Sequence, residues 1–266
     1  MAKAQRIGEV KGLGEVYQLA APLPEQLEAF NEIGAAYVTP DEVALIRLAG
    51  LSDDYSRTSM TSIALKGEPT VLTRVPLLFN PIMARQAVTE NASGRYVKLP
   101  SWVYEIARDE AKAQETIEPE DRKAIILPGD QDFTITPDRN ESKFILRKAN
   151  KEYFERKRNN KPIQVYNLAS DSTKEATVDY TWFDRPQDDS DLNLGDRILD
   201  CHNRAFAVLR KTAEGGSQSS EYNLTEVRNA NLRGKTRFLE QRSMVGLAGI
   251  LEELETVQLD ELRASK

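Results

Sequence analysis

Few residues of this chain have the types and spacing that catalysis requires. The one cysteine and the one histidine, Cys201 and His202, are neighbours in the sequence. The surrounding pattern predicts a helix, on which adjacent side chains point about 100° apart and do not converge on one substrate. A nucleophile and its base must lie within hydrogen-bond reach of each other. We therefore assign no catalytic residue and expect that the protein is not an enzyme.

Oxygen ligands are the second possible source of chemistry. Asp189, Asp191 and Asn193 alternate like the first ligands of a calcium-binding loop, and Asp200 stands at the twelfth position. The glycine that such a loop needs is one place late, at Gly195, and its last ligand would be Asp rather than Glu. Acidic residues that precede a helix explain the same pattern, because they favour the positive end of its dipole. We assign no metal site and expect no cofactor.

Composition limits the compartment and the class of protein. The 266 residues suffice for one large domain or two small ones, with 40% hydrophobic and 29% charged residues. One cysteine excludes an intramolecular disulfide framework, and one histidine excludes a zinc site built on several such ligands. The longest apolar uncharged run, residues 75–84, is far shorter than the roughly 20 residues of a membrane helix. We expect a cytoplasmic protein, or a virion protein assembled in the host cytoplasm.

The largest charge asymmetry lies in residues 139–161. This segment holds nine Lys/Arg and three Asp/Glu, a net charge of +6, whereas the rest of the chain carries −12. The sequence of residues 138–141 predicts a capping box, and Pro162 predicts the end of the basic helix. Its apolar side holds Ile145, Ala149 and Tyr153. The candidate partner-binding residues of this helix are Lys143, Arg147, Lys151, Arg156, Lys157 and Arg158.

Three interpretations of this basic helix remain open. Cations spaced along a helix suit the phosphate backbone of a nucleic acid. The last three of them also complement the helix dipole, which is a purely structural reason for their presence. The helix can equally present a solvated face, or contact the acidic surface of a neighbouring subunit. The acidity of the remaining chain favours a subunit over a nucleic acid as its partner.

Residues 1–115 are expected to form an α-rich region that begins with a glycine-containing extended arm. Pro24 opens one predicted helix, and the segment Thr39-Pro40-Asp41-Glu42 has the cap, the proline and the acid of a strong helix start. These two helices can form a structural hairpin or half of a helix-turn-helix, although residues 53–65 are weak as a recognition helix. A further helix can begin at Pro81 and run through residue 89, and another is predicted at 102–113, after a short strand at 96–99.

Residues 116–190 are expected to form a small antiparallel β-rich region. Strands are predicted at 124–127, 132–136, 163–168 and 176–183, with period-2 alternation clearest in the last. The basic helix lies between the two strand pairs, so the unit is β-β-α-β-β.

Residues 191–266 are expected to be helical, with an internal linker at 214–220. Helices are predicted at 194–213, 222–232 and 236–264. The last carries an amphipathic stripe that needs a partner surface, either within the chain or on another subunit. Its candidate contact residues are Leu247, Leu251 and Leu254.

The expected fold class is therefore α+β: an α-rich N-terminal region, a β-β-α-β-β middle and a helical C-terminal region. No stretch matches a known family residue by residue. We expect a structural or assembly subunit of a larger particle, most concretely a bacteriophage virion component of the neck, tail or capsid. Its expected partners are other protein subunits, as homo- or hetero-oligomer, and not a membrane. The alternative is a nucleic-acid-binding protein that uses residues 139–161.

Overall fold

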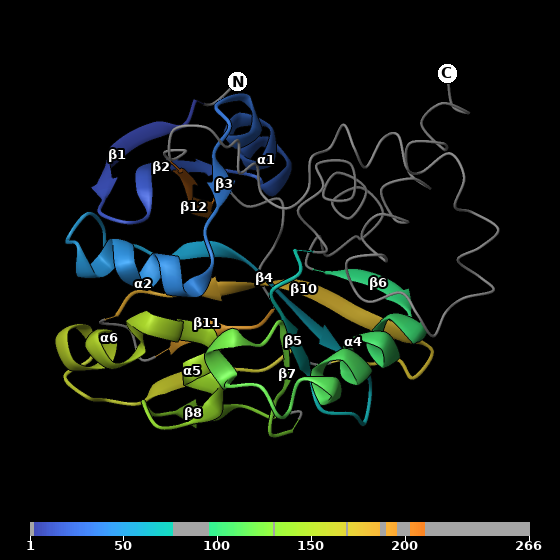
Figure 1. Ribbon diagram of the computed structural model, residues 1–266. Helices are drawn as coiled ribbons and strands as arrows, with labels where there is room; N and C mark the ends of the chain where they lie inside the picture. Colours follow the sequence, from blue (N-terminus) through green and yellow to red (C-terminus); the bar gives the residue numbers. More distant parts are fainter. Residues whose placement is uncertain are drawn as a thin grey trace, which may run out of the picture.

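One mixed sheet of 12 strands organises the part of the chain that the structure describes (Figure 1). The computed structural model describes residues 3–76, 96–129, 131–168, 170–186, 190–195 and 203–210. The strands are β1 (Gln5–Val10), β2 (Gly14–Ala21), β3 (Ala36–Tyr37), β4 (Ser56–Ala64), β5 (Val71–Thr73), β6 (Val97–Pro100), β7 (Ala124–Ile126), β8 (Phe133–Ile135), β9 (Ile163–Tyr166), β10 (Glu175–Phe183), β11 (Ser190–Asn193) and β12 (Asn203–Leu209). The helices are α1 (Leu23–Glu32), α2 (Pro40–Leu48), α4 (Trp102–Ala113), α5 (Asn140–Leu146) and α6 (Asn150–Lys157), with short 3₁₀ turns η1 (Pro119–Asp121) and η2 (Arg147–Ala149).

The strand order brings distant parts of the chain together. The main path of the sheet runs β1-β2-β12-β4-β10-β11-β9-β8. The last described strand, β12, lies between β2 and β4 and pairs antiparallel with residues 15–21 of β2. The strands β5 and β7 extend the sheet from β4, and β6 pairs with β10. Strands from all three predicted regions therefore belong to one sheet, and the predicted domain boundaries stay a prediction.

The predicted fold class is wrong, because the structure is dominated by this sheet. Residues 5–21, predicted as an extended arm, form the hairpin β1–β2. Residues 56–64, considered as part of a helix, form the central strand β4. Residues 203–209, which were expected to be helical, form β12. The predicted helix at 81–89, the other predicted C-terminal helices and the linker at 214–220 lie outside the described residues.

Two layers of helices bury the middle of the sheet on both faces. The helices α2, α5 and α6 pack on one face, where Met60, Ile145 and Phe154 belong to one apolar cluster. The helix α4 packs on the other face, where Ile63 and Tyr180 belong to a second cluster. All nine residues of β4 are buried as a result. A strand covered on both faces loses the alternation of polar and apolar residues that marks a half-exposed strand.

Several local predictions are confirmed. The helix α2 begins at Pro40 after Thr39, and Glu42 accepts the N–H of Thr39 at 2.9 Å, as expected for a capping box. The helix α4 covers the predicted residues 102–113. Strands β7, β8, β9 and β10 lie where the β-rich region was predicted. The basic helix, in contrast, is not continuous, because the chain turns at Arg147 between α5 and η2.

The helix α4 is anchored to the sheet through Tyr104, and this contact predicts a pH-dependent stability. The buried Tyr104 hydroxyl donates to the carbonyl of Pro69 at 2.6 Å. Burial raises the pKa of the Tyr104 phenol to about 12, and the Glu68 carboxylate adds to this rise. The pKa of an unfolded tyrosine is about 10. The contribution of Tyr104 to stability is therefore complete below pH 10 and is lost as the pH rises towards 12.

We expect Tyr104→Phe to lower the free energy of unfolding by about 1 kcal/mol at neutral pH, because the carbonyl of Pro69 loses its donor. The difference between the two proteins should shrink between about pH 10 and 12. Urea unfolding of both proteins from pH 8 to 12 measures it. A difference that is constant over this range would show that folding does not raise the pKa of Tyr104.

Candidate functional site

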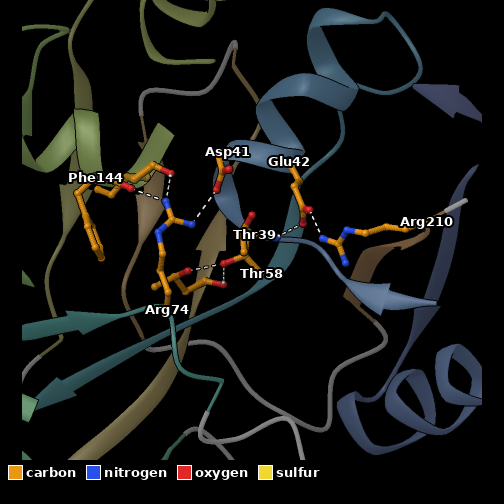
Figure 2. A network of polar contacts seen from close by, with 9 residues as sticks. Thr39, Asp41, Glu42, Thr58, Arg74, Phe144 and Arg210 are labelled. Atoms are coloured by element: carbon orange, nitrogen blue, oxygen red, sulfur yellow. Dashed lines mark hydrogen bonds and ion pairs between the residues drawn. The ribbon is translucent and has the colours of Figure 1, made fainter. Parts of the chain in front are cut away.

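A network of charged side chains surrounds the N-terminal end of α2 and joins four elements (Figure 2). Asp41 and Glu42, at the second and third positions of α2, point to opposite sides of the helix. Asp41 faces Arg74, which follows β5, and Glu42 faces Arg210, which follows β12. Two neighbouring carboxylates therefore hold two cations that come from distant parts of the chain.

Arg74 is the most enclosed member of this network. Its side chain is 9% exposed and its Nη1 donates to the Asp41 carboxylate at 2.9 Å. Its Nη2 donates to the carbonyls of Phe144 and Ile145 at the end of α5, and its guanidinium lies 5.2 Å from the centre of the Phe144 ring. Burial lowers the pKa of Arg74, Asp41 raises it, and the charge of Arg147 lowers it. Arg74 therefore joins the two helices α2 and α5 and lies within electrostatic reach of Arg147.

Part of the positive charge of the segment 139–161 is paired with carboxylates of the chain. Arg156 pairs with Glu152 and Lys151 pairs with Glu155, both four residues apart on α6. Lys157 donates to the Asp53 carboxylate at 2.7 Å.

The remaining predicted residues of this segment lie in different environments. Arg158 is buried and donates to the carbonyls of Pro162 and Pro186. Lys143 is partly exposed on α5, and the neighbouring Lys148, which was not predicted, is exposed on η2. The structure therefore places the six predicted cations on one segment but not on one free surface.

Arg147 is the exception within this segment. Its backbone has φ 46° and ψ −130°, a conformation that glycine adopts readily and that costs other residues about 1–3 kcal/mol. Its side chain is partly buried, and its Nε is buried without a hydrogen-bond partner. Among the arginines that the structure describes, it is the one whose guanidinium makes neither a hydrogen bond nor an ion pair. A strained residue with an unused buried donor is a candidate ligand contact.

A shallow hollow of about 310 Å³ lies beside β8. Arg139 borders it, but its guanidinium already binds Glu141 at 3.0 and 3.2 Å and lies 5.7 Å from the centre of the Phe133 ring. The hollow therefore offers no unused charge from this arginine. Its lining residues are Pro128, Gly129, Gln131, Asp132, Phe133 and Arg139.

The other sequence-based candidates are placed only in part. Within the described residues, no three His, Cys, Asp or Glu side chains gather as metal ligands. Asn193 accepts the N–H of Gly195 at 3.0 Å, whereas the remaining residues of the acidic pattern have no described side chain. Cys201, His202 and the stripe of Leu247, Leu251 and Leu254 lie outside the described residues. None of the described helices is long and apolar enough to cross a membrane.

Sequence reasoning missed the arginines that hold the fold together. Arg47, Arg57 and Arg74 each follow or interrupt an apolar or strand-like run, and the first two are fully buried. A lone arginine within such a run is a usable signal, because a buried guanidinium must bind several acceptors. Arg47 donates to the Tyr153 hydroxyl and to the carbonyls of Asp54 and Phe183.

Comparison with known proteins yields a fold and no family. No protein-family model and no curated protein matches this chain. A similar solved structure is described by the words "Accommodation of massive sequence variation in Nanoarchaeota by the C-type lectin fold". The match has a TM-score of 0.53 and 14% sequence identity, and it covers 76% of this chain and 100% of that chain. At this identity the likeness shows the fold alone, so the chain has a C-type lectin-like fold.

Proposed function

We propose that the chain is an assembly subunit that binds other proteins through the outer side of residues 143–161. We call this surface the α5–α6 face. Its apolar residues, such as Phe144 and Phe154, point into the core, so that exposed charged residues remain outside. The most concrete version of the proposal is a bacteriophage virion component of the neck, tail or capsid, assembled in the host cytoplasm without a cofactor.

The observation that carries the choice of a protein partner is the local pairing of charges on α6. Arg156 and Lys151 already have carboxylate partners on the same helix. Lysine and arginine side chains bind nucleic acids by neutralising phosphates and releasing condensed counterions. Cations that are already paired with carboxylates contribute less to this release. A surface of mixed charges instead suits the rim of a protein interface, where such pairs set partner choice and register. The alternative, nucleic-acid binding through residues 139–161, is supported by the remaining net charge of +6.

The similar fold supports the same proposal. In the Nanoarchaeota protein, the C-type lectin fold is described as accommodating massive sequence variation. A fold that tolerates changed residues suits a scaffold on which binding residues can vary. In this chain, buried arginines such as Arg47 and Arg57 hold the scaffold and leave the α5–α6 face free for such variation.

Light scattering of the full chain tests the proposal. We expect a mass above that of one 29.9 kDa chain, rising with protein concentration and unchanged by added duplex DNA. The double variant Lys148→Glu, Lys151→Glu reverses two exposed charges of the face and should lower this mass. Lys11→Glu, on the exposed β1–β2 turn, is the matched control and should leave the mass unchanged.

A single-chain mass at every concentration would contradict assembly through self-association. A gel shift with duplex DNA at several salt concentrations tests the alternative. Affinity that falls steeply with salt, with a smaller slope in Arg156→Ala, would favour nucleic-acid binding over the proposed function.

A further inference from the structure

Arg147 holds a guanidinium that nothing in the described chain uses. The turn between α5 and η2 keeps its backbone at φ 46°, whereas the other described positive-φ positions hold six glycines and two asparagines, Asn159 and Asn160. Its Nε is buried, and the side chain as a whole is partly exposed. The strained backbone places a charged donor without a partner at a partly exposed position. Packing does not explain this strain, whereas a binding site at Arg147 would.

The surrounding charges determine which anion suits Arg147. Arg74 lies within electrostatic reach of Arg147, and Asp41 balances only one of these two cations. On the far side of α2, Glu42 and Arg210 balance each other. Asp41 is the ion-pair partner of Arg74, so Arg147 is left as a cation without a paired carboxylate, and it suits a ligand with a single negative charge.

One further carboxylate, on the adjacent turn η1, disfavours a doubly charged phosphate. Glu120 lies on η1, which packs against η2, and its Oε2 is buried without a hydrogen-bond partner. Glu120 and Arg147 do not form an ion pair with each other in the structure. A dianion would bring a second negative charge towards the Glu120 carboxylate, whereas a carboxylate ligand presents one charge and the planar geometry that arginine binds through two hydrogen bonds.

We propose that Arg147 is the anchor of a carboxylate-binding site, and that its ligand is an acidic side chain of a partner protein. The identity of the ligand as a partner's side chain rests on the proposed function, whereas the site itself does not. The strained turn then presents Arg147 to the partner, and Arg74 is a second cation within electrostatic reach.

Acetate is the probe for the site. The ¹⁵Nε–¹Hε signal of Arg147, identified by its loss in Arg147→Lys, should shift and saturate with acetate at roughly 10 mM, the scale of one charge-assisted contact. Chloride at the same ionic strength should not change the chemical shift of this signal. Phosphate should change it less than acetate does. An Arg147 signal that acetate does not move, or that phosphate moves more, would overturn the site.

The variant Arg147→Gly gives a second, independent readout. Glycine accepts φ 46°, so the melting temperature should rise, while the additional stabilisation by acetate over chloride should disappear. Arg156→Gln, which removes an exposed and paired cation of the same segment, should keep the acetate effect. Acetate stabilisation that persists in Arg147→Gly would also overturn the site.

Assembly measured by light scattering separates the two parts of the proposal. If acetate binds to Arg147 and the mass of Arg147→Gly falls, the ligand is a partner's carboxylate. If acetate binds and the mass of Arg147→Gly equals that of the wild type, the site stands and its assignment to the partner fails.

Discussion

Arg57→Met is expected to lower the free energy of unfolding by about 3–5 kcal/mol, among the largest effects of any single substitution in the chain. Arg57 lies on the central strand β4 and has no exposed surface. Its guanidinium donates to the Gln26 side chain at 2.8 Å, to the Ala21 carbonyl at 3.2 Å and to the Tyr180 hydroxyl at 3.2 Å. Methionine fills much of the same volume, but it leaves these acceptors without the donor.

The aromatic neighbours of Arg57 add to this effect. The guanidinium carbon lies 5.4 Å from the centre of the Tyr180 ring and 5.7 Å from that of Trp182. A desolvated cation over aromatic rings contributes about 2 kcal/mol in favourable cases. Arg57→Lys keeps the positive charge and one donor. We therefore expect its free energy of unfolding to lie between that of the wild type and that of Arg57→Met.

Urea unfolding measures these differences, with Arg6→Met as the matched control. Arg6 lies on the edge strand β1, and its half-exposed side chain pairs with Glu9 and Glu15. Loss of these surface pairs should cost about 0–1 kcal/mol. If Arg57→Met is as stable as the wild type, apolar packing compensates for the lost hydrogen bonds, and the buried arginine does not hold β4 to α1 and β10 as inferred.

The elements that sequence reasoning predicted correctly have strong local signals. The helix α2 has its cap, proline and acid within four residues, and these make the same contacts in the structure. The strand β10 alternates apolar and polar residues around Tyr180, although these polar residues are buried as well. Signals of this kind do not depend on the rest of the fold, and so they can be found in the sequence.

The failures involve elements whose structure depends on distant partners. The strand β4, SRTSMTSIA, has no clear period because helices cover both of its faces. The strand β12, NRAFAVL, has alanines that suit a helix, but pairing with β2 and β4 overrides this preference. The turn at Arg147 occurs without the glycine or proline that would indicate it.

The candidate site could be predicted from the sequence only as a charged segment. Its net charge indicated a partner surface, but the pair of Lys157 with Asp53 and the buried position of Arg158 depend on the fold. The unused guanidinium of Arg147 is visible only when the partners of the other arginines are known.

Gly14→Ala is the second substitution with a large expected effect, and Gly12→Ala in the same hairpin turn is its matched control. Both glycines have positive φ, 80° for Gly12 and 126° for Gly14. A Cβ on Gly12 would meet nothing within 4 Å, so its alanine variant should lose only about 1 kcal/mol through backbone strain. A Cβ on Gly14 would collide with the carbonyl oxygen of Leu209 and lie 3.1 Å from the Cα of Arg210.

The atoms that Gly14→Ala would displace are backbone atoms, which cannot rotate away. The end of β12 would have to move from β2, where Leu209 pairs with Glu15, and this movement would also separate Arg210 from Glu42. We expect a loss of roughly 3 kcal/mol or more for Gly14→Ala, against the smaller loss for Gly12→Ala. Thermal unfolding of both variants measures the difference. Equal losses would mean that β12 does not approach the β1–β2 turn as closely as described, and the anchoring of Arg210 to α2 would then lack its structural basis.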